Sequence, residues 1–112
     1  MRDDALFLKH IFNAIGVIEE YTSDVTHLVF IQNGMIQDAV MRQLEIIGEA
    51  ARNLSDEIRA EHPDVEWGQI IGMRNRLIHA YFQVDTELIW EIISIDLPLL
   101  KREVEGMISE RS

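Results

Sequence analysis

A stretch of eight residues combines the side chains that are best suited to chemistry, Arg74-Asn75-Arg76-Leu77-Ile78-His79-Ala80-Tyr81. An arginine can hold a phosphate with a planar fork of donors at any relevant pH. A histidine can accept or donate a proton near neutrality. The hydroxyl of Tyr81 can donate a hydrogen bond or be modified. A cation, a proton carrier and a hydroxyl are a minimal set for phosphodiester chemistry without a metal, so Arg74 and His79 are candidate catalytic residues.

The local secondary structure decides whether these two side chains can meet. In one continuous helix Arg74 and His79 would lie ~140° apart around the axis, whereas Asn75 would share a face with His79. The two candidates converge if the helix ends near Ile78, or if the long arginine side chain wraps round it. Arg76, three residues before His79, is a second cation that could reach the same point.

The composition indicates one soluble domain over residues 1–112. The absence of cysteine excludes disulfides, thiolate catalysis and Cys-based zinc sites. The scattered histidines follow no metal-ligand spacing, and no Gly-rich phosphate loop is present, so we expect neither a metal nor a cofactor. No apolar run approaches the ~20 residues of a membrane span, and the first residues do not resemble a signal peptide. These features predict a cytoplasmic protein with no membrane contact.

The formal net charge of −10 counts against a nuclease without excluding one. Proteins that bind nucleic acids usually carry a basic patch, because phosphate contacts supply most of their non-specific affinity. Binding of RNA by this chain would therefore need a local cluster of arginine or lysine, or a basic partner.

Apolar residues recur at helical spacing through most of the chain, which predicts an all-α bundle of four or five helices. Pro63 should stop a helix, Asp85 should cap one, and Pro98 should kink or break the last one near Leu97. The expected helices cover residues 3–21, 27–31, about 34–54, 67–78 and 85 to the C-terminal region.

Two observations suggest a homodimer. The helix near 34–54 carries a second apolar line of Met35, Ala39, Ile46 and Ala50, which suits either a second subunit or the centre of a monomeric bundle equally well. One histidine is also too few for a reaction that needs both a base and an acid. A two-fold interface would bring two copies of the motif into one cleft. We therefore expect a homodimer if the site is catalytic, with this face and the motif as the candidate interface.

The Arg-x4-His-x-Tyr pattern of residues 74–81 resembles the motif of HepT-like proteins, a branch of the HEPN superfamily. The resemblance extends from residue 3 to about residue 104. It includes Leu44-Glu45-Ile46-Ile47-Gly48-Glu49-Ala50-Ala51, Pro63 to Trp67, Gly72-Met73, Val84-Asp85, Trp90-Glu91 and Asp96-Leu97-Pro98.

The resemblance implies an all-helical HEPN-like homodimer that acts as the toxin of a two-gene, type II-like toxin–antitoxin system. It implies a metal-independent ribonuclease and, as antitoxin, a minimal nucleotidyltransferase (MNT). Arg74 would bind the scissile phosphate, and His79 would act as general base or acid with the RNA 2′-hydroxyl as nucleophile. Asn75 would orient the histidine or the phosphate. Tyr81 matches the tyrosine that the antitoxin can modify with AMP, whose bulk and charge would block the cleft and repel RNA.

A second hypothesis remains open. The chain could be a non-catalytic helical interaction module that partners a nucleotidyltransferase and keeps the motif to bind a nucleotide or phosphate. A plain dimeric scaffold, in which solvated arginines and a structural histidine are replaceable, is a third. Replacement of His79 by alanine distinguishes them, because only the ribonuclease should lose activity while keeping its fold.

Overall fold

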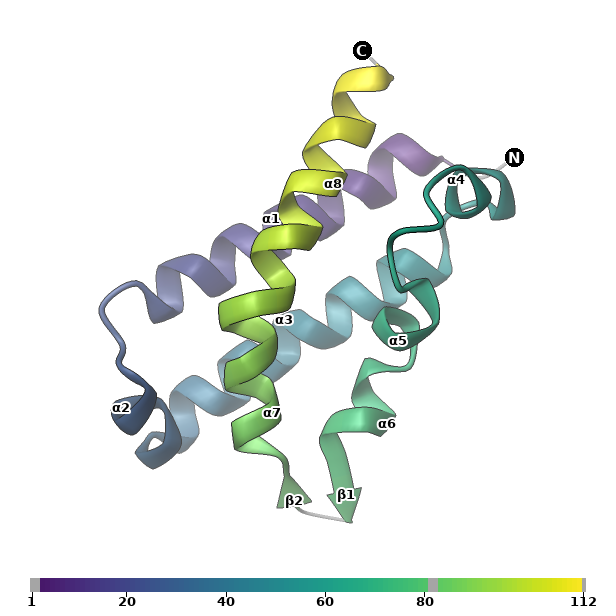
Figure 1. Cartoon of the computed structure of the whole chain (residues 1–112). Coiled ribbons are helices and arrows are strands. Elements are labelled where there is room, and N and C mark those ends of the chain that lie inside the picture. The colour runs from purple at the N-terminus through teal and green to yellow at the C-terminus, as the bar shows by residue number, and fades with distance from the viewer. Residues whose placement is uncertain (1–2, 81–82, 112) are drawn as a thin grey trace.

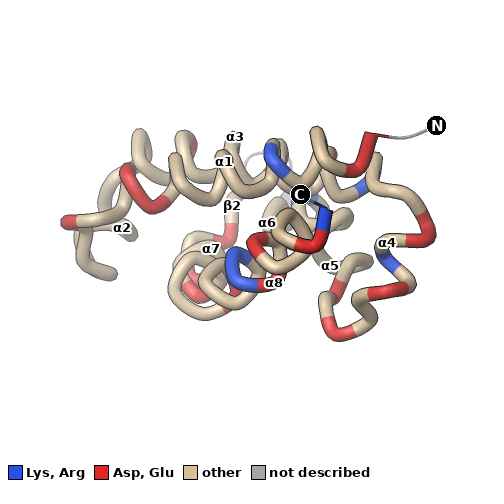
Figure 2. The backbone as a smooth tube through the Cα atoms, turned by 90° about the horizontal axis from the view of Figure 1, so that it is seen from above, with Lys and Arg blue, Asp and Glu red and all other residues tan. Residues whose placement is uncertain are grey.

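Two layers of helices form the protein, which we describe from a computed structural model (Figures 1 and 2). The structure describes residues 3–80 and 83–111, with the side chains of all but residues 79, 80 and 83. One layer holds the two longest helices, α1 (Asp4–Thr22) and α3 (Gly34–Arg52), which pack along each other. The other holds a rod made of α7 (Thr86–Glu91), the π-helical turn η1 (Ile92–Asp96) and α8 (Leu97–Glu110).

Short elements connect these long helices. They are α2 (His27–Gln32), α4 (Asp56–Glu61), α5 (Trp67–Ile71), α6 (Met73–Leu77) and the strands β1 (Ile78–Ala80) and β2 (Gln83–Val84). The strands pair antiparallel, with Ile78 opposite Val84 and Ala80 opposite Gln83. This hairpin lies at the bottom of Figure 1, and residues near both ends of the sequence lie at the top.

The core consists of the apolar stripes that the sequence predicts. Every fully buried side chain among the described residues is hydrophobic, as helical periodicity on one face requires. The first helix contributes Leu8, Ile11, Ile15 and Ile18; the third contributes Val40, Leu44, Ile47 and Ala51; the last contributes Leu97, Leu100, Val104 and Met107.

Polar residues cap the N-termini of α1, α2, α3, α4 and α7. An oxygen of each capping side chain accepts a hydrogen bond from the backbone N–H three residues later, which satisfies a donor that the helix leaves unpaired. The predicted cap at Asp85 is confirmed, since its carboxylate accepts from the N–H of Leu88 at 3.0 Å. Asn33 does the same for the N–H of Ile36 at 3.0 Å and starts α3.

The all-α class is confirmed, but the described residues form eight α-helices and one π-helical turn rather than four or five helices. The chain breaks after α3, so Ile58 lies on the separate helix α4 instead of extending the third helix. It breaks again at Gly72, between α5 and α6. The two-residue to three-residue strands of the hairpin were not predicted either.

The sequence predicts a kink or a break near Leu97, and the structure has a π-helical turn there instead of a break. A proline inside a helix lacks the N–H and its ring meets the carbonyl four residues earlier. Here the preceding turn widens into η1, where the N–H of Leu97 donates to the carbonyl of Ile92, five residues back. The helical rod therefore continues through the proline.

The second apolar line of α3 is only partly covered by the chain itself, since Met35 is 84% exposed and Ala39 is half-buried. Ala50 is buried, Ile46 is half-buried, and α3 contacts α1, α2, α5, α6 and α7. The helix lies at the centre of the bundle, and the exposed part of its second apolar line leaves room for a second subunit. The homodimer remains a prediction. No helix in the described part of the chain is long and apolar enough to span a membrane.

Candidate nucleic-acid interface

The helix that carries Arg74 ends before His79. Residue Ile78 is extended, with φ −106° and ψ 101°, and its N–H donates to the carbonyl of Arg74 to close the last turn of α6. The N–H of Asp85 donates to the carbonyl of Leu77 at 2.8 Å, which joins the end of α6 to the start of α7. Arg74 is therefore on a helix and His79 on strand β1, so the ~140° separation of a continuous helix does not apply to them.

The two arginines of the motif, Arg74 and Arg76, lie on different surfaces of the protein. Arg74 and Asn75 are exposed, and the side chain of Arg74 makes no hydrogen bond or ion pair with any described residue. Arg76 is half-buried and lines a separate hollow of about 300 Å³ whose rim is acidic, with Asp64, Glu66, Asp96 and Glu103. Arg76 therefore does not share the surface of Arg74. The side chain of His79 and all of Tyr81 lie outside the part of the chain that is described.

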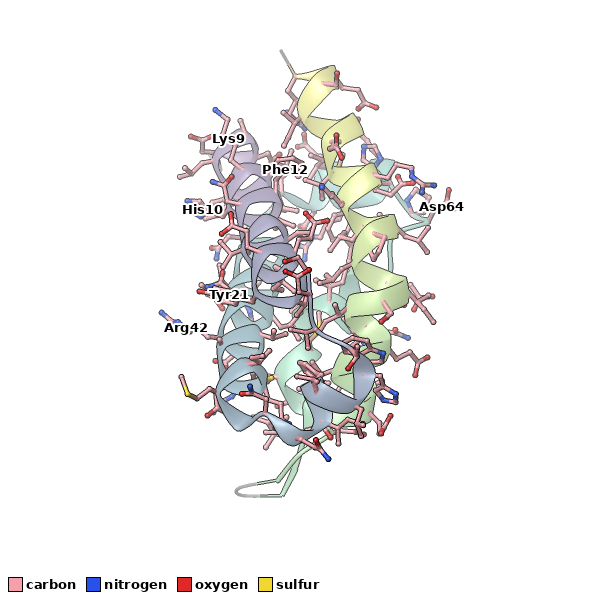
Figure 3. The ribbon with its side chains drawn as sticks, turned by 90° about the vertical axis from the view of Figure 1, so that its left-hand side faces the viewer. Lys9, His10, Phe12, Tyr21, Arg42 and Asp64 are labelled. Carbon is pink, nitrogen blue, oxygen red and sulfur yellow. The ribbon has the colours of Figure 1, made fainter. Side chains whose placement is uncertain are left out.

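Arg74 lines a groove of about 560 Å³ between α1, α3 and the α5–α6 segment, which we call the Arg74 groove. Its polar lining carries three arginines, two glutamates and one histidine. The lining residues are Phe7, His10, Arg42, Leu44, Glu45, Ile46, Gly48, Glu49, Ala50, Arg52, Asn53, Ile71, Met73 and Arg74. His10 on α1 and Arg42 on α3 project from the same side of the molecule, whereas Asp64 lies on the other side (Figure 3).

The Arg74 groove differs in charge from the rest of the surface. Arginines outnumber carboxylates in its lining, whereas carboxylates outnumber arginines in each of three other hollows on the surface. Acidic residues also prevail along α4 and the segment before α5 (Figure 2). The chain thus holds the local arginine cluster that RNA binding would require of a protein with a net charge of −10.

Three polar residues of this groove were missed at the level of sequence. No sequence motif includes Arg42 or Arg52, and His10 is one of the scattered histidines that follow no metal-ligand spacing. His10 is exposed, and its ring meets the edge of Phe7 with centroids 5.8 Å apart. The spacing of Arg42, Glu49 and Arg52 places them on one face of α3, but only the packing of α1 and α5 makes that face a groove.

No group of three or more histidine, aspartate or glutamate side chains among the described residues is arranged to hold a metal ion. The arginines of the Arg74 groove can bind an anion, since guanidinium groups bind phosphate through paired donors.

The comparison with known proteins defines the class. The profile of the family described as "Ribonuclease HepT-like" matches residues 11–107, most of the chain. The chain therefore belongs to the HepT-like ribonuclease family, as its resemblance to that family predicted.

Named relatives agree with this membership. "Putative RNase MJ1380" of Methanocaldococcus jannaschii is 44% identical over 93% of this chain and 95% of its own length. "Probable ribonuclease HepT" of Thermococcus cleftensis is 40% identical over 90% of this chain and 92% of its own. "Gamma-glutamylcyclotransferase and putative RNase MJ0434" of M. jannaschii is 42% identical over 97% of this chain, which corresponds to 49% of that longer protein. No solved structure matches the chain significantly.

Proposed function

We propose that the chain is a metal-independent endoribonuclease that binds the scissile phosphate of RNA through Arg74 and moves the reacting proton through His79. The observation that carries the proposal is the exposed guanidinium of Arg74, which has no partner among the described residues and lines an arginine-rich groove. Membership of the HepT-like ribonuclease family and the ribonuclease names of the relatives support the same activity.

The reaction needs no metal if the RNA supplies its own nucleophile. The 2′-oxygen attacks the adjacent phosphorus after a base removes its proton, and the 5′-oxygen of the next nucleotide leaves with a proton from an acid. The products are a 2′,3′-cyclic phosphate and a free 5′-hydroxyl. Arg74 would stabilise the negative charge that grows on the phosphate oxygens, and Asn75, exposed beside it, would orient the phosphate or His79.

We further propose a homodimer in which two copies of the motif share one cleft, so that one histidine serves as base and the other as acid. Within the proposal the chain is the toxin of a toxin–antitoxin pair, and the antitoxin is an MNT-type nucleotidyltransferase. Transfer of AMP to Tyr81 would add a negative group two residues from His79 and repel the RNA backbone. The family resemblance of residues 74–81 supports this arrangement.

The test is cleavage of a single-stranded RNA by purified protein in EDTA, with the wild type beside His79→Ala and Arg74→Gln. We expect wild-type cleavage with cyclic phosphate ends and a loss of about 10²–10⁴-fold in rate for His79→Ala. Arg102→Gln is the matched control for Arg74→Gln, because Arg102 is exposed on α8 and does not line the groove. Both should fold like the wild type, and only Arg74→Gln should lose activity.

The same experiment measures the oligomeric state of each variant by light scattering. Absence of cleavage by a folded wild-type dimer would contradict the enzymatic proposal and favour the non-catalytic interaction module. Cleavage that survives His79→Ala would remove His79 from the reaction.

A further inference from the structure

A second arginine of the Arg74 groove is available for an anion. Arg42 lies on α3, is exposed and lines the groove, and its side chain makes no hydrogen bond or ion pair with any described residue. Figure 3 shows its side chain extending away from the helix. Its donors are therefore as free to meet an incoming phosphate as those of Arg74.

Ion pairs take up only part of the positive charge of the protein. The chain has 20 acidic and 10 basic residues, and four lysine or arginine side chains of the described part lie within 4 Å of a carboxylate. Arg52 lies 3.6 Å from Glu49, and Arg59, Lys101 and Arg111 also lie within 4 Å of a carboxylate. Arg42 and Arg74 remain unpaired within the described part of the chain although Glu45 and Glu49 line the same groove. Both guanidinium groups thus keep their full capacity for an external anion.

The rim of the groove also offers a surface for an unpaired base. Phe7 is half-buried and His10 exposed, and their rings meet edge to face on α1. Aromatic rings stack with the bases of single-stranded nucleic acids, which double-stranded RNA does not expose. Proteins that bind single-stranded nucleic acids commonly combine cationic side chains with aromatic rings in this way.

We propose that Arg42 binds a second phosphate of a single-stranded RNA, so that the Arg74 groove holds a run of backbone rather than one phosphodiester. The inference rests on the proposed function for its substrate class, and it assigns to Arg42 a binding role outside the motif. The RNA would extend from the phosphate at Arg74 across α3 towards α1, with a base against Phe7 and His10.

The experiment measures the affinity of a labelled 2′-O-methyl RNA hexanucleotide, which cannot be cleaved through its 2′-oxygen, by fluorescence anisotropy in EDTA. One phosphate contact to a single strand contributes about 0.7 to the slope of log affinity against log salt concentration, which amounts to about eightfold in affinity at about 50 mM relative to about 1 M. For Arg42→Gln we expect the slope to be smaller than that of the wild type by about 0.7, and the affinity at about 50 mM salt to be about eightfold lower. Arg42→Lys should restore most of the slope, because it restores the charge.

Arg102→Gln is the matched control, since it removes the same charge from an exposed position outside the groove. If Arg42→Gln and Arg102→Gln both bind like the wild type, the inference is wrong, while cleavage that depends on Arg74 and His79 would leave the proposed function standing. If binding depends on Arg42 but ordinary RNA is never cut, the groove binds RNA and the enzymatic proposal fails instead.

Discussion

Gly48 is the residue at which α5 comes against the backbone of α3. A Cβ added at Gly48 would lie 3.0 Å from the carbonyl oxygen of Ile70 and 3.5 Å from that of Ile71. A Cβ at this distance would be tighter than nine in ten real Cβ contacts, so the backbone of α5 would have to move away. Gly48 and Ile71 both line the Arg74 groove, and Arg74 follows three residues after Ile71. Because Gly48 has no side chain, α5 packs closely on α3, and this packing helps to position Arg74 relative to α3.

At this residue scale we predict that Gly48→Ala lowers the free energy of unfolding by about 1–3 kcal/mol, because the new methyl group presses on backbone atoms that cannot rotate away. The matched control is Gly106→Ala on α8, where a Cβ would have nothing within 4 Å. That substitution should stabilise the protein by about 0.5–1 kcal/mol through helix propensity. Urea unfolding measures both, and equal effects of the two substitutions would contradict the close packing at Gly48.

Asp4 connects three elements at one corner of the protein. Its carboxylate accepts hydrogen bonds from the backbone N–H of Ser55 at 2.8 Å and from the Ser55 hydroxyl at 2.7 Å. The same hydroxyl oxygen accepts from the N–H of Ile58 and so caps α4. The guanidinium of Arg111, after α8, lies 3.7 Å from Asp4. The first turn of α1 thus fixes the start of α4 and the end of the helical rod.

At the element scale we predict that Asp4→Ala lowers the free energy of unfolding by about 1–3 kcal/mol, since it leaves a partly buried hydrogen-bonded network without its acceptor. Asp3→Ala, which removes only the exposed cap of α1, should cost about 1 kcal/mol. In a double-mutant cycle, Asp4→Ala and Ser55→Ala together should cost less than the sum of the single changes. Additive effects would show that the two side chains do not act as a unit.

The long helices could be predicted from sequence because each buries one apolar stripe and several begin at a capping residue. The break between α5 and α6 and the β1–β2 hairpin could not be predicted in this way. Gly72 divides α5 from α6, and the hairpin depends on a bond between Asp85 and Leu77, which packing brings together. The motif residues were identified by type and spacing. Arg42 and His10 were not, because their place in the groove follows from how α1 packs on α3, which no local pattern records.

The whole molecule carries an excess of ten negative charges. Self-repulsion of this size destabilises the folded state, and salt screens it over a Debye length of about 10 Å at about 0.1 M. RNA binding in the Arg74 groove should show the opposite response, because salt competes with phosphate for the arginines. Folding and binding of one protein are thus expected to respond to salt in opposite directions.

At this scale we predict that the melting temperature rises when NaCl increases from about 20 mM to about 500 mM, because self-repulsion is screened. Differential scanning calorimetry at the two concentrations measures the effect. Glu105→Gln removes one exposed charge on α8 and should raise the melting temperature at low salt, with little effect at high salt. A melting temperature that falls with NaCl would mean that attractive ion pairs outweigh the net repulsion.

The contact between Asp4 and Arg111 has a consequence for the architecture of larger chains. Residues 4 and 111 are neighbours, and they lie at the opposite end of the molecule from the β1–β2 hairpin (Figure 1). Adjacent ends of this kind allow a fold to be circularly permuted or joined to another domain without crossing its own surface. A domain attached at either of these positions would join the molecule at the end opposite the hairpin.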